Sequence, residues 1–171
     1  MPIELIEQAA THTPIARRAI TNLKVLDEAP DYGSAFSRGL RLDFNGLTIL
    51  DISGTASIDE RGQSIHIGDF DAQLRRTFAN ITALLEVEGA TWKDIVRTRC
   101  YLRDIDRDYA AFNRVRNQFF REQGLSPFPA STGIQAKLCR PELLVEIEAQ
   151  AMFHTPDTQR FATAQEFSLQ P

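Results

Sequence analysis

The chain has 171 residues, is 43% hydrophobic and 25% charged, and carries a net charge of −4 from 19 basic and 23 acidic residues. This length suits one domain with a sizeable core, and the composition excludes a disordered or fibrous protein. No basic run and no apolar stretch of bilayer length occurs, so the sequence argues against nucleic-acid binding and predicts no membrane span. The first residues lack the pattern of a signal peptide, and we expect a cytoplasmic protein.

Residues 1–30 show mixed polarity and weak periodicity, and we expect an N-terminal extension there. Alternating hydrophobic residues then indicate a strand, at Phe36, Leu40, Leu42 and Phe44. Asn45-Gly46 favours a hairpin turn after this strand, because both turn positions need positive φ. The next strand, at 47–52, is apolar on both faces, which predicts that both faces of the sheet are covered.

Two helices are predicted, each with a single apolar face. The first begins at Gly68-Asp69 and ends near Gly89, and the second ends at Gly124 with Asp106 or Asp108 as its N-cap. The apolar face of the first helix comprises Leu74, Phe78, Ile81 and Leu85. That of the second comprises Tyr109, Phe112, Val115 and Phe119.

Three more strands are expected, at about 95–102, 129–138 and 143–153, followed by a polar, peripheral tail. This order predicts an α+β fold in which two helices pack on one face of a mixed sheet. Because each helix has only one apolar stripe, the helices cover one sheet face, and partner subunits must bury the other. The sequence therefore predicts an oligomer.

Strand alternation sorts the side chains of these three strands between the two sheet faces. The helix side is expected to receive Val96, Thr98, Cys100, Leu102, Val145, Ile147 and Ala149. The open face is expected to receive Arg97, Arg99, Tyr101, Arg103, Glu146 and Glu148, joined by Ser131, Gly133 and Gln135. This polar set fits either an interface salt-bridge network or a ligand site in which an arginine grips a carboxylate.

Several short stretches follow one another along the chain and carry a resemblance as an ordered set. They are Tyr32-Gly33-Ser34-Ala35, Ile52-Ser53-Gly54, Leu84-Leu85-Glu86, Phe128-Pro129-Ala130-Ser131-Thr132 and Val145-Glu146-Ile147-Glu148-Ala149. With this set the chain resembles the RidA/YjgF family. The resemblance implies a domain at 31–154, between the extension and a tail at 155–171. It implies a chorismate-mutase-like sheet in a homotrimeric barrel with clefts between subunits. It also implies hydrolysis of enamines or imines such as 2-aminoacrylate, with no metal or organic cofactor.

The resemblance assigns roles to single residues and shows one departure from the family. Glu146 matches the carboxylate that positions water, and Tyr32 matches a pocket tyrosine. Ser131 stands where deaminases of the family carry a carboxylate-binding arginine, and Gly133 stands at a position that is usually cysteine. We therefore expect weak hydrolysis of 2-aminoacrylate, with Arg97 or Arg99 as the substitute clamp. Tyr101, Thr132 and Gln135 complete the expected pocket for a small carboxylate.

A narrower resemblance is to the RidA-like half of chorismatases. It rests on the stretches 53–58 and 129–134, and on Cys139, which precedes Glu146 by seven residues as in one class of those enzymes. It implies a lyase or hydrolase that acts on chorismate through Cys139 and Glu146, although chorismatases are about twice as long as this chain. A non-catalytic, ligand-binding trimer is the other alternative. A ribonuclease or translation-inhibitor activity is disfavoured by the acidic charge balance.

Overall fold

The computed structural model describes residues 15–21, 23–24, 26 and 34–155. Its strands are β1 (Ala16–Ala19), β2 (Gly39–Phe44), β3 (Leu47–Ala56), β4 (Ile95–Leu102), β5 (Ala130–Gln135) and β6 (Val145–His154). Its helices are α1 (Phe70–Glu86), the short 3₁₀ helix η2 (Trp92–Asp94) and α2 (Ile105–Glu122).

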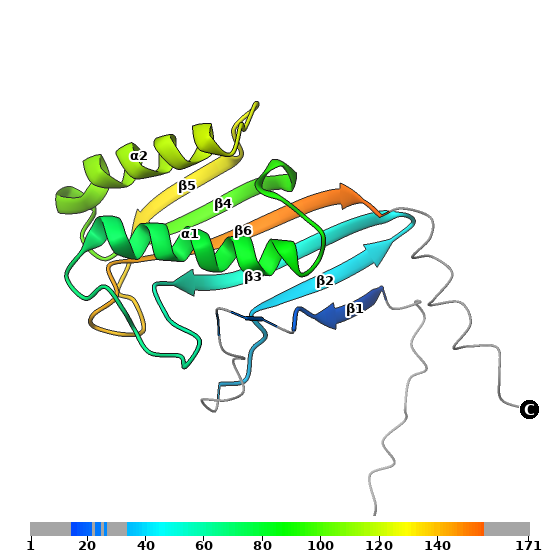
Figure 1. The fold of residues 1–171 in the computed structure, drawn as a ribbon, viewed down its shortest axis with the longest axis horizontal. Helices are drawn as coiled ribbons and strands as arrows, with labels where there is room; N and C mark the ends of the chain where they lie inside the picture. Colours follow the sequence, from blue (N-terminus) through cyan, green and yellow to red (C-terminus); the bar gives the residue numbers. More distant parts are fainter. Residues whose placement is uncertain (1–14, 22, 25, 27–33, 156–171) are drawn as a thin grey trace, which may run out of the picture.

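One six-stranded sheet carries the fold, with the strand order β1-β2-β3-β6-β4-β5. All neighbouring strands are antiparallel except β4 and β5, which are parallel and are joined through α2. Both helices lie on one face of the sheet (Figure 1), and no helix of the described residues covers the other face. The predicted mixed sheet with two helices on one face is confirmed.

Helix α1 begins and packs as its sequence predicts. The side chain of Asp69 accepts a hydrogen bond from the Ala72 backbone N–H at 3.0 Å and caps the helix. Gly89, just beyond the helix, has φ +71°, which an L side chain rarely adopts. The predicted apolar face is buried at all four positions, Leu74, Phe78, Ile81 and Leu85.

Helix α2 differs from its prediction at the cap and on the apolar face. Asp104 is the N-cap and accepts from the Arg107 N–H at 3.0 Å, so Asp106 and Asp108 lie inside the first turn. Tyr109 is 51% exposed, so the expectation that it lies on the apolar face was wrong, whereas Phe120 is buried. Phe119 stacks on Phe78 of α1, with ring centroids 4.4 Å apart.

Strand β4 departs from simple alternation at its start. Its pairing with β6 shifts in register between Ile95 and Arg97. As a result Ile95 is buried and Val96 is 40% exposed, so the expectation that Val96 lies on the helix side was wrong. Beyond the shift the alternation is regular, with Thr98, Cys100 and Leu102 buried under the helices as predicted.

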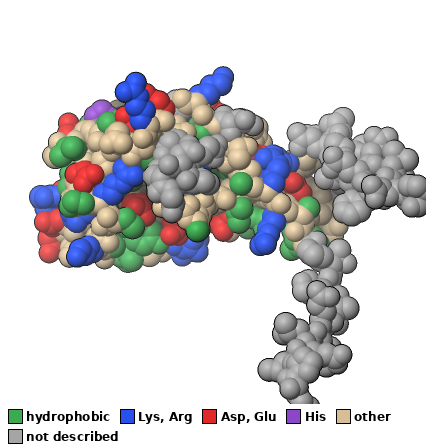
Figure 2. All heavy atoms as spheres, turned by 90° about the horizontal axis from the view of Figure 1, so that it is seen from below, with side chains coloured by type: hydrophobic (Ala, Val, Ile, Leu, Met, Phe, Trp, Pro, Cys, Tyr) green, Lys and Arg blue, Asp and Glu red, His purple; other side chains and the backbone are tan. Residues whose placement is uncertain are grey.

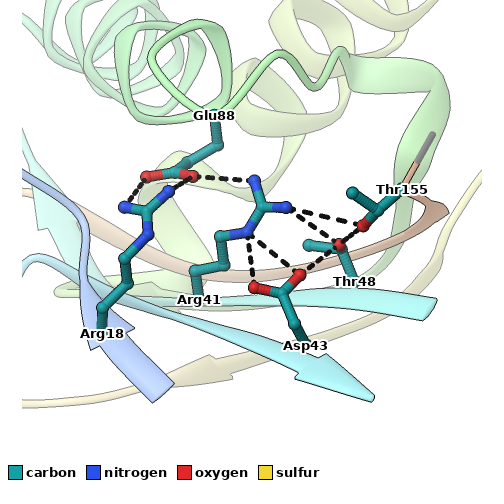
Figure 3. Close-up of polar contacts among 6 residues, drawn as sticks. All are labelled: Arg18, Arg41, Asp43, Thr48, Glu88 and Thr155. Carbon is teal, nitrogen blue, oxygen red and sulfur yellow. Dashed lines mark hydrogen bonds and ion pairs between the residues drawn. The ribbon is translucent and has the colours of Figure 1, made fainter. Parts of the chain in front are cut away.

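A strand inside the predicted N-terminal extension belongs to the sheet. β1 pairs with β2, and Glu88, just after α1, holds both strands (Figure 3). Arg18 of β1 donates to both carboxylate oxygens of Glu88 at 2.8 and 2.6 Å, and Arg41 of β2 donates to one of them at 3.1 Å. Arg41 also bonds Asp43 at 2.9 Å. Residues 16–19 are therefore paired into the sheet.

Within the described part of the chain, no helix combines the length and the apolar character that crossing a bilayer requires. Figure 2 shows acidic, basic and hydrophobic side chains interspersed on the uncovered surface of this view.

Candidate active site

The open sheet face carries Glu146 on β6, between two neighbouring strands. Glu146 pairs with Ala56 of β3 on one side and with Tyr101 of β4 on the other, and paired residues share a sheet face. Val145, Ile147 and Ala149 of the same strand are buried under the helices. The predicted orientation of Glu146 and Glu148, away from the helices, is thus confirmed.

Gly54 makes room for the Glu146 carboxylate. The pairing of β3 with β6 is irregular between Ile52 and Thr55, and Gly54 lies within this irregularity. A Cβ at Gly54 would overlap Glu146 Oε1 and would lie 2.9 Å from its Cδ. A larger residue at position 54 would displace the Glu146 carboxylate, and glycine lets it lie close to the β3 backbone. The sequence signal for this role was a glycine in the middle of an apolar strand.

Glu146 is electrostatically different from its neighbour Glu148. Burial raises the pKa of Glu146, and the negative charge of Glu148 raises it further. In the described part of the chain, no hydrogen bond or ion pair engages the Glu146 carboxylate. Such a carboxyl group retains its proton at higher pH than an ordinary glutamate, which suits it to proton transfer.

Glu148 is occupied by two partners from β4. Arg99 Nη1 lies 3.2 Å from Glu148 Oε2, and the Tyr101 hydroxyl donates to Glu148 Oε1 at 3.0 Å. Burial together with the hydrogen bond and charge of Glu148 raises the pKa of Tyr101, so its phenol remains a donor. The salt-bridge alternative is therefore correct for Arg99 and Glu148, and it leaves Glu146 available.

The expectation that Ser131, Gly133 and Gln135 share the open face was wrong. Thr98, which is buried under the helices, donates to Ser131 Oγ at 3.0 Å, and Gln135 Oε1 accepts from the Ile105 N–H of α2 at 3.1 Å. The cause is the parallel register, which pairs Thr98 with Ser131 and Arg97 with Ala130. Alternation within β5 predicts which of its residues share a sheet face with one another. It does not predict which of them share a face with a given residue of β4.

The open face instead receives Thr132 from β5. Arg97 Nη2 donates to Thr132 Oγ1 at 3.3 Å. The Arg97 Nε is buried and has no hydrogen-bond partner among the described residues. Arg97 thus lies on the same face as Glu146, but on the opposite side of the sheet from Ser131.

A second polar cluster lies on the helix side of β5, and sequence reasoning did not find it. Arg116 of α2 donates to Ser131 Oγ at 3.4 Å and to Asn113 Oδ1 at 2.7 Å. Cys100 Sγ lies 4.0 Å from the same serine oxygen, and burial raises the pKa of this thiol. The sequence feature that could have indicated this cluster is the position of Arg116 one helical turn after the buried Phe112, which places both residues on the same side of α2.

The remaining predicted site residues lie elsewhere. Cys139 is exposed in the connection between β5 and β6, and no described contact joins it to Glu146. Arg103 donates to backbone carbonyls of that connection, at Leu143 and Arg140. Tyr32 lies outside the described residues. In the same part of the chain, no group of three His, Cys, Asp or Glu side chains could hold a metal ion.

Two hollows of the described chain lie away from both polar clusters. One hollow lies along α1, and another lies between η2 and the loop before β5. Neither hollow is lined by Glu146 or Ser131. The two polar clusters lie on opposite sides of the sheet and outside both hollows.

Comparisons with known proteins agree with this architecture. The family described as Endoribonuclease L-PSP matches residues 27–153. The 3-aminoacrylate deaminase RutC of Acinetobacter baylyi is 34% identical over 103 residues, which cover 60% of this chain and 78% of that protein.

Solved structures show the same fold. The YjgF gene product of E. coli has a TM-score of 0.64 at 25% identity, covering 78% of this chain and 97% of its own. YyfA of Yersinia pestis, from the conserved Rid protein family, has a TM-score of 0.65 at 28% identity, covering 80% of this chain and 98% of its own.

Proposed function

Because this chain belongs to the endoribonuclease L-PSP family, the RidA/YjgF family, we propose that it hydrolyses a small enamine or imine that carries a carboxylate. The observation that carries the proposal is the Glu146 carboxyl group, which rests on Gly54, has a raised pKa and has no partner in the described chain. The similarity to a 3-aminoacrylate deaminase supports this substrate class.

The proposed reaction needs only water and a proton carrier. Protonated Glu146 gives its proton to the enamine carbon, which leaves an iminium ion and a carboxylate. The carboxylate then takes a proton from water as the hydroxide adds to the C=N carbon. The resulting carbinolamine receives a proton on nitrogen from Glu146 and returns its hydroxyl proton to the carboxylate. Ammonia leaves, the carbonyl product forms, and Glu146 is again protonated.

We further propose that a second copy of the chain completes the site. Glu146 and Ser131 lie on opposite sides of one sheet, so a single protomer cannot place both around one small molecule. The open face also exposes apolar side chains, including Phe44 at 55% and Ile134 at 47%, which suits burial against another protomer. A homotrimer with clefts between protomers is the arrangement we expect.

The test is turnover of 2-aminoacrylate and 3-aminoacrylate, generated in situ and followed by release of ammonia. We expect the native protein to accelerate release, and Glu146→Gln to lower kcat/KM by about 100-fold or more because amide cannot carry the proton. Glu122→Gln, on the exposed side of α2, serves as the control and should leave kcat/KM unchanged. Equal activity of Glu146→Gln and the native protein would refute the role of Glu146.

A further inference from the structure

The guanidinium group of Arg116 occupies the space beside Ser131, where relatives are expected to carry their carboxylate-binding arginine. We propose that Arg116 of α2 is the residue that binds the substrate carboxylate in this chain. This inference rests on the proposed function and deepens it, because it identifies the group that recognises the substrate. The positively charged group is then supplied by α2 instead of by β5.

Arg116 is held in place by neutral groups only. Its Nη2 donates to Asn113 Oδ1 at 2.7 Å, its Nη1 donates to Ser131 Oγ at 3.4 Å, and its Cζ lies 4.7 Å from the centroid of the Phe112 ring. Among the described residues, no carboxylate lies within ion-pair distance of it. Arg114, on the same helix, is instead paired with Asp71 at 2.7 Å. A fixed but unneutralised guanidinium, with N–H donors to spare, is suited to a two-point grip on an anion.

Ser131 adds a hydrogen-bond donor to the same position. Its oxygen accepts from Thr98 at 3.0 Å and from Arg116, so its own hydroxyl hydrogen is left to donate. The neighbouring acceptor is the Cys100 sulfur at 4.0 Å, which is a weak one. Because burial raises the pKa of Cys100, this thiol adds no negative charge that would repel an anion.

Gly133 leaves the space next to this cluster open. It follows Ser131 on the same side of β5, and a Cβ built there would meet nothing within 4 Å. A carboxylate bound to Arg116 and Ser131 therefore has room for the rest of a small metabolite. The two arginines on the open face are less suited, because Arg99 is paired with Glu148 and Arg97 lies on the other side of the sheet from Ser131.

Binding of pyruvate and benzoate to the full chain, measured by titration calorimetry, tests this inference without depending on turnover. We expect Arg116→Ala to weaken binding about 10- to 100-fold, as loss of charge-assisted hydrogen bonds does. Arg116→Lys should recover only part of the affinity, because a lysine cannot make the two-point contact. Arg114→Ala is the matched control and should bind within about twofold of the native protein. Ser131→Arg in the Arg116→Ala background should restore binding.

The outcomes separate the two proposals. If Arg116→Ala binds as the native protein does, the proposed role of Arg116 is refuted. It is also refuted if Arg97→Ala loses binding while Arg116→Ala retains it. Neither result bears on the role of Glu146. If the native protein binds neither pyruvate nor benzoate but releases ammonia from 3-aminoacrylate, the role of Arg116 is refuted and the proposed function stands; if it does neither, both proposals are refuted. The melting temperatures of the same samples are measured as a control for folding. Loss of binding in Arg116→Ala supports the role of Arg116 only if Arg116→Ala and Arg116→Lys melt close to the native protein.

Discussion

Glu146 combines two environments that rarely occur together, a half-buried carboxyl group and a second carboxylate on the same strand. Burial disfavours its charged form, and the charge of Glu148 adds to this effect. Glu148 itself is bonded to Arg99 and Tyr101. Two glutamates at alternate positions of one strand thereby acquire different roles, one held by ion pairing and one available for proton transfer.

The raised pKa of Glu146 has a consequence for stability. Because the folded chain holds this proton more tightly than the unfolded chain, the contribution of Glu146 is fully present below the ordinary carboxyl pKa and is lost as pH rises through the folded pKa. A glutamine at position 146 does not titrate, so Glu146→Gln avoids the loss of stability at higher pH. Each tenfold difference in proton affinity between the folded and unfolded chain corresponds to about 1.4 kcal/mol of free energy of unfolding. We expect Glu146→Gln to melt a few degrees above the native protein at pH 7 and close to it at pH 4.

Melting curves from pH 4 to pH 8 measure this difference, with Glu122→Gln as the control for a generic charge effect. A constant difference between Glu146→Gln and the native protein across this range would contradict the raised pKa.

At the residue scale, alternation in the sequence predicted where Glu146 and Glu148 point, because one strand face is apolar throughout. It did not predict the environment of Glu146, since Gly54 reaches it from another strand across an irregular pairing. Nor did it predict Arg116, because a contact between α2 and β5 depends on how a crossover helix lies on the sheet.

Among the secondary-structure elements, the two helices differ in how well local signals define them. The cap of α1 lies where the sequence predicted it, at Asp69 after Gly68, and Asp71 lies inside the first turn. Before α2 the segment Asp104–Asp108 offers three aspartates, and the structure selects Asp104, one residue before the helix. Asp108 is instead buried and bonded to Arg107 at 2.7 Å. Propensity alone does not choose among capping residues placed two apart.

The cap assignment predicts a difference between two neighbouring substitutions. Asp104→Ala should lower the free energy of unfolding by about 1 kcal/mol, because the Arg107 N–H loses its acceptor. Asp106→Ala removes only a favourable charge in the first turn and should cost about half of that or less. Urea denaturation of both variants measures the two values. Equal losses, or a larger loss for Asp106→Ala, would contradict the assignment.

The sheet shows the same limit of local patterns. The hairpin at Asn45-Gly46 and the helix-facing side of β6 follow from turn chemistry and alternation. The orientation of β5 was mistaken because its register relative to β4 is fixed by the α2 crossover. β1 was missed because its four residues, Ala16–Ala19, carry two arginines and no apolar alternation. Its attachment depends on Glu88, some seventy residues away in the chain.

For the whole molecule, the argument from amphipathic helices was sufficient to predict an uncovered sheet face. Two helices with one apolar stripe each can cover only one side, and Figure 1 shows this arrangement. The hydrophobic pattern of one chain does not predict how many copies bury the other side, because every copy of the chain has the same pattern. Because the sheet separates Glu146 from Ser131 and Arg116, the proposed assembly would also bring these groups together from two protomers.

Activity of mixed assemblies tests this account most directly. Glu146→Gln and Arg116→Ala chains, each strongly impaired in kcat/KM when assembled alone, are unfolded together in equal amounts and refolded, and ammonia release is measured at 3-aminoacrylate concentrations below KM. If each site takes Glu146 from one protomer and Arg116 from the next, random assembly should restore about a quarter of the native activity, since half of the protomers at each of two positions are intact. A mixture as inactive as its two components, alongside native chains that regain activity after the same treatment, would contradict a site shared between protomers.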